Sequence, residues 1–330
     1  MSLTICTVVY NEEKNVGTIS QNMECLRHHW PTARLLIIDN ASTDSTLKQL
    51  RQTFWADHAI FLQRQQNHLG EARQQAMETC QTAWLCFLDA DCTISVPWIV
   101  QAKKTLDSQP LHVAGVGGAW CPGGAWAALY QNLFSTVLGH AGLPYLQKPS
   151  VPAQVFHLPT AAVIYRKEAL IRAGGFDGDA QLVGEDLQMS YKLHQAGYTL
   201  VLDPALNFEH ILPANFLIWW KKMWRYGTAR GKMVWMFPQM WAQRGLWVWA
   251  FLSALGLVMV FLGRPLLALG FCFFYLFFCV VVCWWSSPRD WQKVYLLMLG
   301  THWFYGAGML WGLLRAGLGW RPFSLPMRKA

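Results

Sequence analysis

The chain has 330 residues, 53% of them hydrophobic, and a formal charge of +8 at pH 7. This length allows one large or two ordinary domains. The charge does not indicate a nucleic-acid partner, and we expect none, because many cations lie beside apolar segments, where they more often face an anionic membrane surface. These cations are Lys221, Lys222, Arg225, Arg230, Lys232 and Arg244. The nine cysteines form no C-x-x-C pair, which favours reduced thiols and a cytosolic catalytic face.

Predicted strands and helices alternate over residues 3–88. Runs rich in β-branched and other apolar residues predict strands at 3–10, 34–38, 60–62 and 84–88. Helices are expected at 16–28, from Ser42 or Asp44 to 53, and up to residue 80. This alternation implies right-handed crossovers and a mostly parallel central sheet, which is the arrangement of an α/β fold.

The strand at 84–88 ends in two acidic residues, Asp89 and Asp91. Ligands of parallel sheets bind beyond the carboxyl ends of the strands, so both side chains would face a ligand. Two carboxylates one residue apart suit Mg²⁺ or Mn²⁺, which would share phosphate oxygens with a substrate. The alternative is a turn in which Asp serves only for its local hydrogen bonds.

Polar residues also follow the other predicted strands, at the same edge of the sheet. Asn11, Glu12, Asp39 and Asp44 offer mostly acceptors, which suit ribose hydroxyls and a base N–H. Arg73 is a candidate to orient one of the two acidic residues. Taken singly, the aspartates are as readily turn or cap residues and the arginine a solvated cation. Neither common phosphate-binding loop, G-x-G-x-x-G after a strand or G-x-x-x-x-G-K-[ST], is present, so the phosphates would depend on the metal.

A second acidic pair, Glu185 and Asp186, opens a helix predicted over Leu187–Gln195. An alcohol that attacks an anomeric carbon needs a base, and a carboxylate that the helix N-terminus keeps ionised can serve. Acids at a helix start are also ordinary caps. His210 follows a short strand and is a candidate additional metal ligand, although a lone histidine is more often structural.

The motifs occur in a fixed order along residues 3–210. They are Thr7–Glu13, Ile38–Asp44, Gly70–Arg73, Asp89–Asp91, Tyr165–Leu170 with Gly174–Asp177, and Gly184–Leu187. Together they resemble glycosyltransferase family 2, whose members have the GT-A fold. Residues 220–231 and the apolar tail are similar to the membrane-attached branch that includes succinoglycan-type transferases.

The resemblance implies a donor site for a nucleotide-diphospho-sugar. Asp39 would meet the nucleobase, and Asn11 and Glu12 would line the nucleoside pocket. Asp89 would lie against the ribose and the sugar. Arg73 lies within Gly70–Arg73, one of the matching motifs.

The resemblance also implies the reaction. Asp91 would hold Mn²⁺ or Mg²⁺ on the donor diphosphate, and Asp186 would be the catalytic base. A single in-line displacement would invert the anomeric configuration. Asn40 stands where many relatives carry Asp, and Gln74 where Asn is usual, which leaves the choice of base open.

The composition divides the chain into three parts. We expect a GT-A catalytic domain at 1–212, amphipathic interfacial helices at 213–244 and a transmembrane region of about three helices at 245–330. The apolar spans are Leu246–Gly263, Leu266–Trp285 and Val294–Leu314. Cations before the first span place the catalytic domain on the cytoplasmic face of the inner (plasma) membrane. Three crossings would then put the cationic tail outside, which the positive-inside tendency opposes. Either the glycine-rich third span is re-entrant or the tail is an exception, and we favour three crossings.

The expected function is therefore that of a membrane-anchored, inverting, metal-dependent glycosyltransferase in polysaccharide biosynthesis. It would move a sugar to a lipid-linked or membrane-proximal glycan acceptor, with membrane lipids as further partners. The alternative is a noncatalytic membrane subunit that binds a nucleotide-sugar within a polysaccharide assembly complex. A processive synthase is disfavoured because no Q-x-x-R-W segment follows Asp186.

Overall fold

The computed structural model describes residues 2–66, 68–140, 146, 149–177, 184–236, 262–263 and 265–318. Contacts divide the chain into two compact units. The first comprises Met1–Cys121, Lys148–Ile211 and Pro322–Ala330, and the second Pro122–Gln147 and Leu212–Arg321.

The first unit is built on an eight-stranded sheet with the order β3-β2-β1-β4-β9-β6-β10-β8. The strands are β1 Leu3–Val9, β2 Arg34–Asp39, β3 Ala59–Gln63, β4 Trp84–Leu88, β6 Val113–Gly117, β8 Ala153–Val155, β9 Ala162–Arg166 and β10 Thr199–Leu202. Every residue of β4 is buried, as expected for a central strand covered on both faces. The four strands predicted over residues 3–88 are confirmed and pair in parallel.

The expectation of a mostly parallel sheet is only partly correct, because the sheet is mixed. Strand β9 lies between β4 and β6 and runs antiparallel to both, and β8 pairs antiparallel with β10. The first four residues of β9, Ala162–Tyr165, form an apolar and fully buried run. Such a run predicts burial but carries no information on strand direction.

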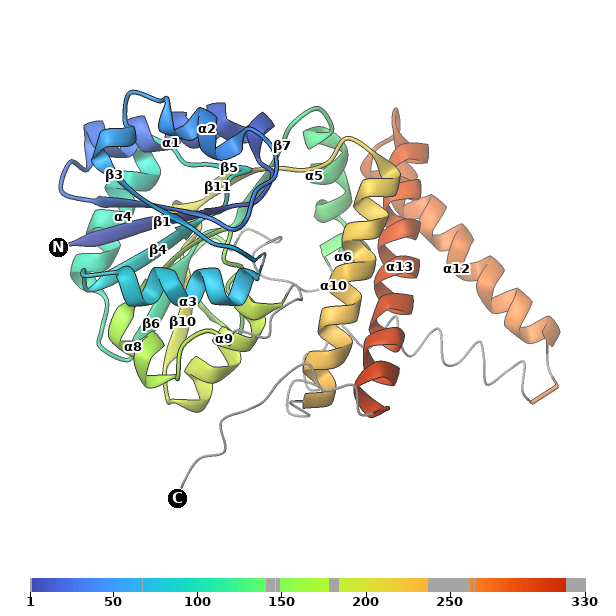
Figure 1. Ribbon diagram of the computed structural model, residues 1–330. Helices are drawn as coiled ribbons and strands as arrows, with labels where there is room; N and C mark the ends of the chain where they lie inside the picture. Colours follow the sequence, from blue (N-terminus) through green and yellow to red (C-terminus); the bar gives the residue numbers. More distant parts are fainter. Residues whose placement is uncertain are drawn as a thin grey trace, which may run out of the picture. The chain divides into compact units, whose positions relative to one another are not determined.

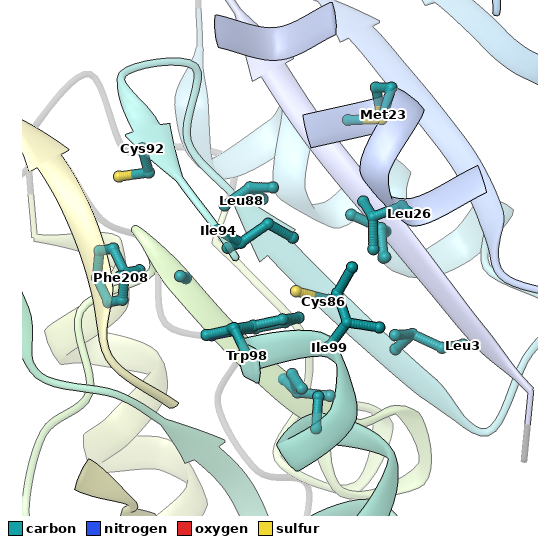
Figure 2. Close-up of a cluster of buried hydrophobic side chains, with 14 of the residues drawn as sticks. Leu3, Met23, Leu26, Cys86, Leu88, Cys92, Ile94, Trp98, Ile99 and Phe208 are labelled. Carbon is teal, nitrogen blue, oxygen red and sulfur yellow. The ribbon is translucent and has the colours of Figure 1, made fainter. Parts of the chain in front are cut away.

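Helices cover both faces of this sheet (Figure 1). In chain order they are α1 Val16–His29, α2 Thr46–Arg51, α3 Leu69–Thr79, α4 Val96–Ser108, α8 Lys167–Arg172 and α9 Glu185–Gln195, with short 3₁₀ turns at Glu13–Asn15, Ala56–His58 and Pro204–Leu206. Figure 1 shows α1 and α2 on one side of the sheet and α3, α8 and α9 on the other. Figure 2 shows the core on the first side, where Met23 and Leu26 of α1 and Trp98 and Ile99 of α4 pack over the strands.

A second, three-stranded sheet has the order β5-β11-β7. Its strands are β5 Cys92–Thr93, β11 Phe208–Ile211 and β7 Trp120–Gly123. Strand β11 runs antiparallel to β5, with His210 directly opposite Cys92. This small sheet therefore brings a residue from late in the chain to the acidic turn that follows β4.

The second unit is helical, with α5 Ala127–Ser135, α6 Val137–His140, α10 Phe216–Met236, α12 Pro265–Ser286 and α13 Trp291–Gly317. Helices α10 and α13 meet along glycines. A Cβ atom at Gly227 or Gly231 would lie 2.1 Å from a carbonyl oxygen of α13, and one at Gly308 or Gly312 would lie 2.4 or 2.2 Å from a carbonyl oxygen of α10. Only glycine permits this approach, so these residues hold the two backbones in contact.

The predicted membrane spans are not supported. Helices α12 and α13 form over the second and third spans. Among the helices that the structure describes, none combines the length and apolar character needed to cross a membrane. The first span, Leu246–Gly263, lies outside the described residues except for its last two.

Candidate active site

The turn after β4 directs Asp91 towards β11. The N–H of Cys92 donates to the carbonyl oxygen of Asp89 at 3.1 Å, which closes the turn. The Oδ2 atom of Asp91 then lies 3.2 Å from Nε2 of His210. The side chain of Asp91 is 32% exposed and that of His210 only 5%, so the pair is open on the aspartate side.

Asp91 and His210 form a cluster with Cys92. One ligand atom from each of the three residues lies within 4.8 Å of the others. A carboxylate oxygen, an imidazole nitrogen and a sulfur at this spacing fit a divalent transition metal. Both residues predicted as metal ligands are thus brought together, with a thiol that the sequence did not indicate.

Arg73 lies between the two acidic motifs. The guanidinium is 3.5 Å from Asp89 Oδ1 and donates to Glu185 Oε1, and its side chain is 4% exposed. It also lies over the ring of Phe87 at 5.5 Å. Burial lowers the pKa of Arg73, but the charges of Glu185, Asp89 and Asp186 outweigh this and raise it. Arg73 therefore stays charged and holds the end of β4 against the start of α9.

The side chain of Asp186 faces His157. Nε2 of His157 lies 3.2 Å from Oδ2 of Asp186, and the N–H of Leu187 donates to Oδ1 at 2.7 Å. Burial would raise the pKa of Asp186, but the charge and hydrogen bond of His157, with a contribution from Arg73, lower it to about 2. The site thus holds Asp186 as a carboxylate at neutral pH.

Glu185 has the opposite environment from its neighbour. Burial raises its pKa, and the guanidinium of Arg73 opposes this rise. Its side chain is 5% exposed. One carboxylate oxygen accepts a hydrogen bond from Arg73 and the other from the N–H of Gly184. Of the two adjacent acids, Glu185 is bound into the structure and Asp186 is the more exposed, at 22%.

The predicted nucleoside residues lie at the ends of β1 and β2. Thr43 N–H donates to Asn11 Oδ1 at 2.8 Å, which joins the two loops. Asp39 is fully buried, with Oδ1 accepting from the N–H of Ser42 at 3.3 Å. Burial raises the pKa of Glu12, and the charge of Asp91 adds to this rise.

Each residue predicted for the site lies in the first unit. Two groups are joined by contacts: Asp91 with His210, and Arg73 with Asp89 and the α9 start that carries Asp186. His157 and Cys92 were not predicted from the sequence. His157 lies in an irregular segment without a motif, so nothing in the sequence connected it with Asp186. Cys92 is adjacent to the D-x-D pair, and that adjacency was a usable signal.

A mixed α/β sheet whose central strand ends in two carboxylates, with a second acidic pair held against them, is the architecture of GT-A-like sugar transferases. Residues 4–174 match the family model described as glycosyl transferase family 2. The chain belongs to this family and is a glycosyltransferase.

The chain is similar to several curated glycosyltransferases. It is 23% identical over 274 residues to "Glycosyltransferase AglE" of Haloferax volcanii, an alignment that covers 80% of this chain and 82% of that protein. It is 27% identical over 169 residues to "Pre-mycofactocin glycosyltransferase" of Mycobacterium tuberculosis, covering 51% of this chain and 35% of the relative. Both relatives are named as glycosyltransferases, in agreement with the family match.

Solved structures show the same fold. A mannosyltransferase, PcManGT from Pyrobaculum calidifontis in complex with GDP-Man and Mn²⁺, has a TM-score of 0.62 at 16% identity, covering 94% of this chain and 87% of that one. TarS residues 1–349 of S. aureus in complex with UDP has a TM-score of 0.51 at 13% identity, covering 97% and 92%. Both likenesses establish a GT-A-like fold.

Proposed function

We propose that the chain is an inverting glycosyltransferase that depends on Mn²⁺ or Mg²⁺. The donor is a nucleotide-diphospho-sugar, and the acceptor is the hydroxyl of a lipid-linked or membrane-proximal glycan. The observation that carries this proposal is Arg73, which contacts Asp89 of the D-x-D motif and Glu185 beside Asp186. These contacts support placing the residues assigned to donor and base in one site.

In this reaction Asp186 takes the proton of the acceptor hydroxyl. The hydroxyl oxygen forms a bond to the anomeric carbon while the bond from that carbon to the diphosphate breaks, and the nucleoside diphosphate leaves with the electron pair. The lowered pKa of Asp186 keeps the carboxylate ready to accept a proton. His157 lies against this carboxylate, with Nε2 3.2 Å from Oδ2, and so limits its orientation.

The donor lies along the ends of β1, β2 and β4. Asp39 meets the base, Asn11 and Glu12 line the nucleoside pocket, and Asp89 lies against the ribose and the sugar. When bound at Asp91 and His210, the metal supplies positive charge that stabilises the leaving diphosphate. The donor set of this site fits such an ion.

Two substitutions test the assignment of base and metal ligand. Asp186→Asn should lower the transfer rate by roughly 10²- to 10⁴-fold, because it removes the general base and leaves the shape intact. Asp91→Asn should abolish metal-dependent transfer. Asp107→Asn, an exposed acid on α4, is the matched control and should leave the rate unchanged. Full activity in either site variant would remove that residue from its role.

The donor is identified by a screen of labelled nucleotide-sugars with Mn²⁺, with and without polyprenyl-linked acceptors. Turnover of one donor, including slow hydrolysis without acceptor, is the expected result. The alternative function, a noncatalytic subunit that only binds the nucleotide-sugar, predicts saturable binding with no turnover of any donor under the same conditions.

We also propose that the chain works at the cytoplasmic face of the plasma membrane. Along α10 the exposed side chains Leu217, Ile218, Lys221, Trp224 and Arg225 recur at helical spacing on one face. Aliphatic and tryptophan side chains interleaved with cations are typical of a helix that lies in the headgroup region of anionic lipids.

Helix α12 adds an apolar surface to the second unit. Its exposed side chains are Leu266, Leu269, Phe273, Phe274, Phe277, Phe278, Val281, Trp284 and Trp285. Exposed apolar side chains in this number mark a surface that is covered by lipid or by another protein. The cations of α10 favour lipid as the occupant.

A further inference from the structure

The metal-binding cluster contains a sulfur atom, which the family resemblance does not explain. We propose that Cys92 is a ligand in this site, and that the site therefore binds thiophilic divalent ions such as Co²⁺, Zn²⁺ and Cd²⁺ more tightly than Mn²⁺ or Mg²⁺. The proposal rests on the assignment of the metal site to Asp91 and His210, and it adds a third donor of different chemistry.

Strand pairing places the thiol beside the other two ligands. Cys92 of β5 and His210 of β11 are directly opposite each other in the antiparallel pair, so their side chains lie on the same face. Sγ of Cys92 is 3.7 Å from Oδ1 of Asp91. Figure 2 shows the sulfur of Cys92 directed towards β11. One donor atom from each of the three residues thus lies within 4.8 Å of the others.

Neighbouring side chains fix the positions of these donors. Asn22 of α1 donates to the carbonyl oxygen of Cys92 at 2.6 Å and accepts from the N–H of Ile94 at 3.1 Å, which ties β5 to the helix. The ring of Trp120 packs edge-on against that of His210, with centroids 4.5 Å apart. Such supporting contacts orient ligands in metal sites.

The donor set determines which ions are favoured. Mg²⁺ prefers oxygen ligands, and Mn²⁺ lies at the weak end of the affinity order for nitrogen and sulfur donors. Co²⁺, Zn²⁺ and Cd²⁺ form strong bonds to thiolate, and the thiol releases its proton to solvent as the bond forms. Mn²⁺ would be held mainly by the carboxylate and the imidazole, while the softer ions would use all three donors.

Titration of the full chain with Co²⁺, without any donor sugar, tests the proposal. A thiolate bound to Co²⁺ gives a sulfur-to-metal charge-transfer band in the near ultraviolet, which oxygen and nitrogen ligands do not give. We expect this band in the unaltered chain. Cys92→Ser should remove it and weaken Co²⁺ binding by roughly tenfold or more, while Mn²⁺ affinity changes by less than about threefold.

Cys25→Ser is the control for adventitious binding. Cys25 is partly exposed on α1 and lines a surface depression with His28 and His29, which offers a second thiol beside imidazoles. The band should persist in this variant. Loss of the band in Cys25→Ser, or its persistence in Cys92→Ser, would overturn the proposal. If Cys92→Ser fails to fold, the same spectrum is recorded for Cys92→Ala, in which the band should also be absent.

The result separates this inference from the proposed function. A cobalt–thiolate band without turnover of any nucleotide-sugar would support the ligand assignment and contradict the enzymatic proposal. Metal-dependent transfer that Asp91→Asn abolishes, with no such band in the unaltered chain, would support the enzyme and overturn the role of Cys92.

Discussion

The charge state of the base depends on one histidine. His157 is the largest influence that lowers the pKa of Asp186 against the effect of burial. His157→Gln should therefore raise this pKa, by about one unit or more. Because the base acts only when ionised, kcat/KM should begin to fall at a higher pH than in the unaltered chain as the solution is made acidic. The measurement is the pH profile of kcat/KM.

The control for this prediction is His58→Gln, which alters an exposed histidine in the 3₁₀ turn Ala56–His58, outside the site motifs. An unchanged acid limb in His157→Gln would show that the pair does not set the pKa of Asp186.

The pH dependence of folding stability provides a second measurement of this pair. Since Asp186 titrates at about 2 in the folded chain and at about 3.9 when unfolded, the pair stabilises the fold at neutral pH. This contribution is lost as the pH falls through that interval.

At the residue scale, the sequence predicted which acidic residues belong to the site and their order along the chain. It did not predict which side chains contact them. The positions of Asp89 and Asp91 followed from an apolar strand with a polar end, because strand direction places them at the ligand-binding edge. The contacts of His157 with Asp186 and of Arg73 with Glu185 join residues far apart in the sequence. No periodicity or motif spacing encodes such pairs, since they depend on how elements distant in the sequence pack against one another.

Glycines on facing helices provide a test at the element scale. A Cβ at Gly308 would lie 2.4 Å from the carbonyl oxygen of Trp224, so Gly308→Ala forces α10 and α13 apart. Overpacking of this kind costs about 1–3 kcal/mol of unfolding free energy. Chemical denaturation of the full chain, followed by tryptophan fluorescence, measures the loss.

Gly306→Ala is the matched control on the same helix. Nothing lies within 4 Å of a Cβ at this position, and alanine favours a helix over glycine by about 1 kcal/mol. This variant should be neutral or more stable. Equal stability of Gly308→Ala and Gly306→Ala would mean that the close approach of the two helices is not required.

Individual elements were more predictable than their assembly. The alternating strands and helices over residues 3–88 followed from apolar runs and caps, whereas β9 was missed because Tyr165 and Arg166 had been assigned only to a motif. In the second unit, the third predicted span, which contains the glycines of α13, had been interpreted as either re-entrant or a full crossing, with the full crossing favoured. The structure instead uses Gly308 and Gly312 for contact with α10. A glycine-rich pattern allows both interpretations, since it shows only that backbones approach closely.

At the scale of the whole molecule, the proposed location depends on a few cations. Lys221 and Arg225 lie on the exposed face of α10 beside Trp224. Each cation near an anionic surface contributes about 1 kcal/mol to binding. Replacing both with Gln should therefore weaken binding of the full chain to phosphatidylserine-containing vesicles by about 30-fold, with less effect at high salt because the attraction is screened.

The matched control is Lys48→Gln with Lys104→Gln, which removes the same charge from exposed positions on helices of the first unit. If net charge alone drove association, both pairs would weaken vesicle flotation equally. If α10 is the membrane-facing element, only the substitutions at Lys221 and Arg225 should weaken vesicle flotation. Neutral vesicles should then bind the unaltered chain and both double variants equally, because the apolar side chains remain. A loss confined to the control pair would place the membrane-binding surface on the first unit.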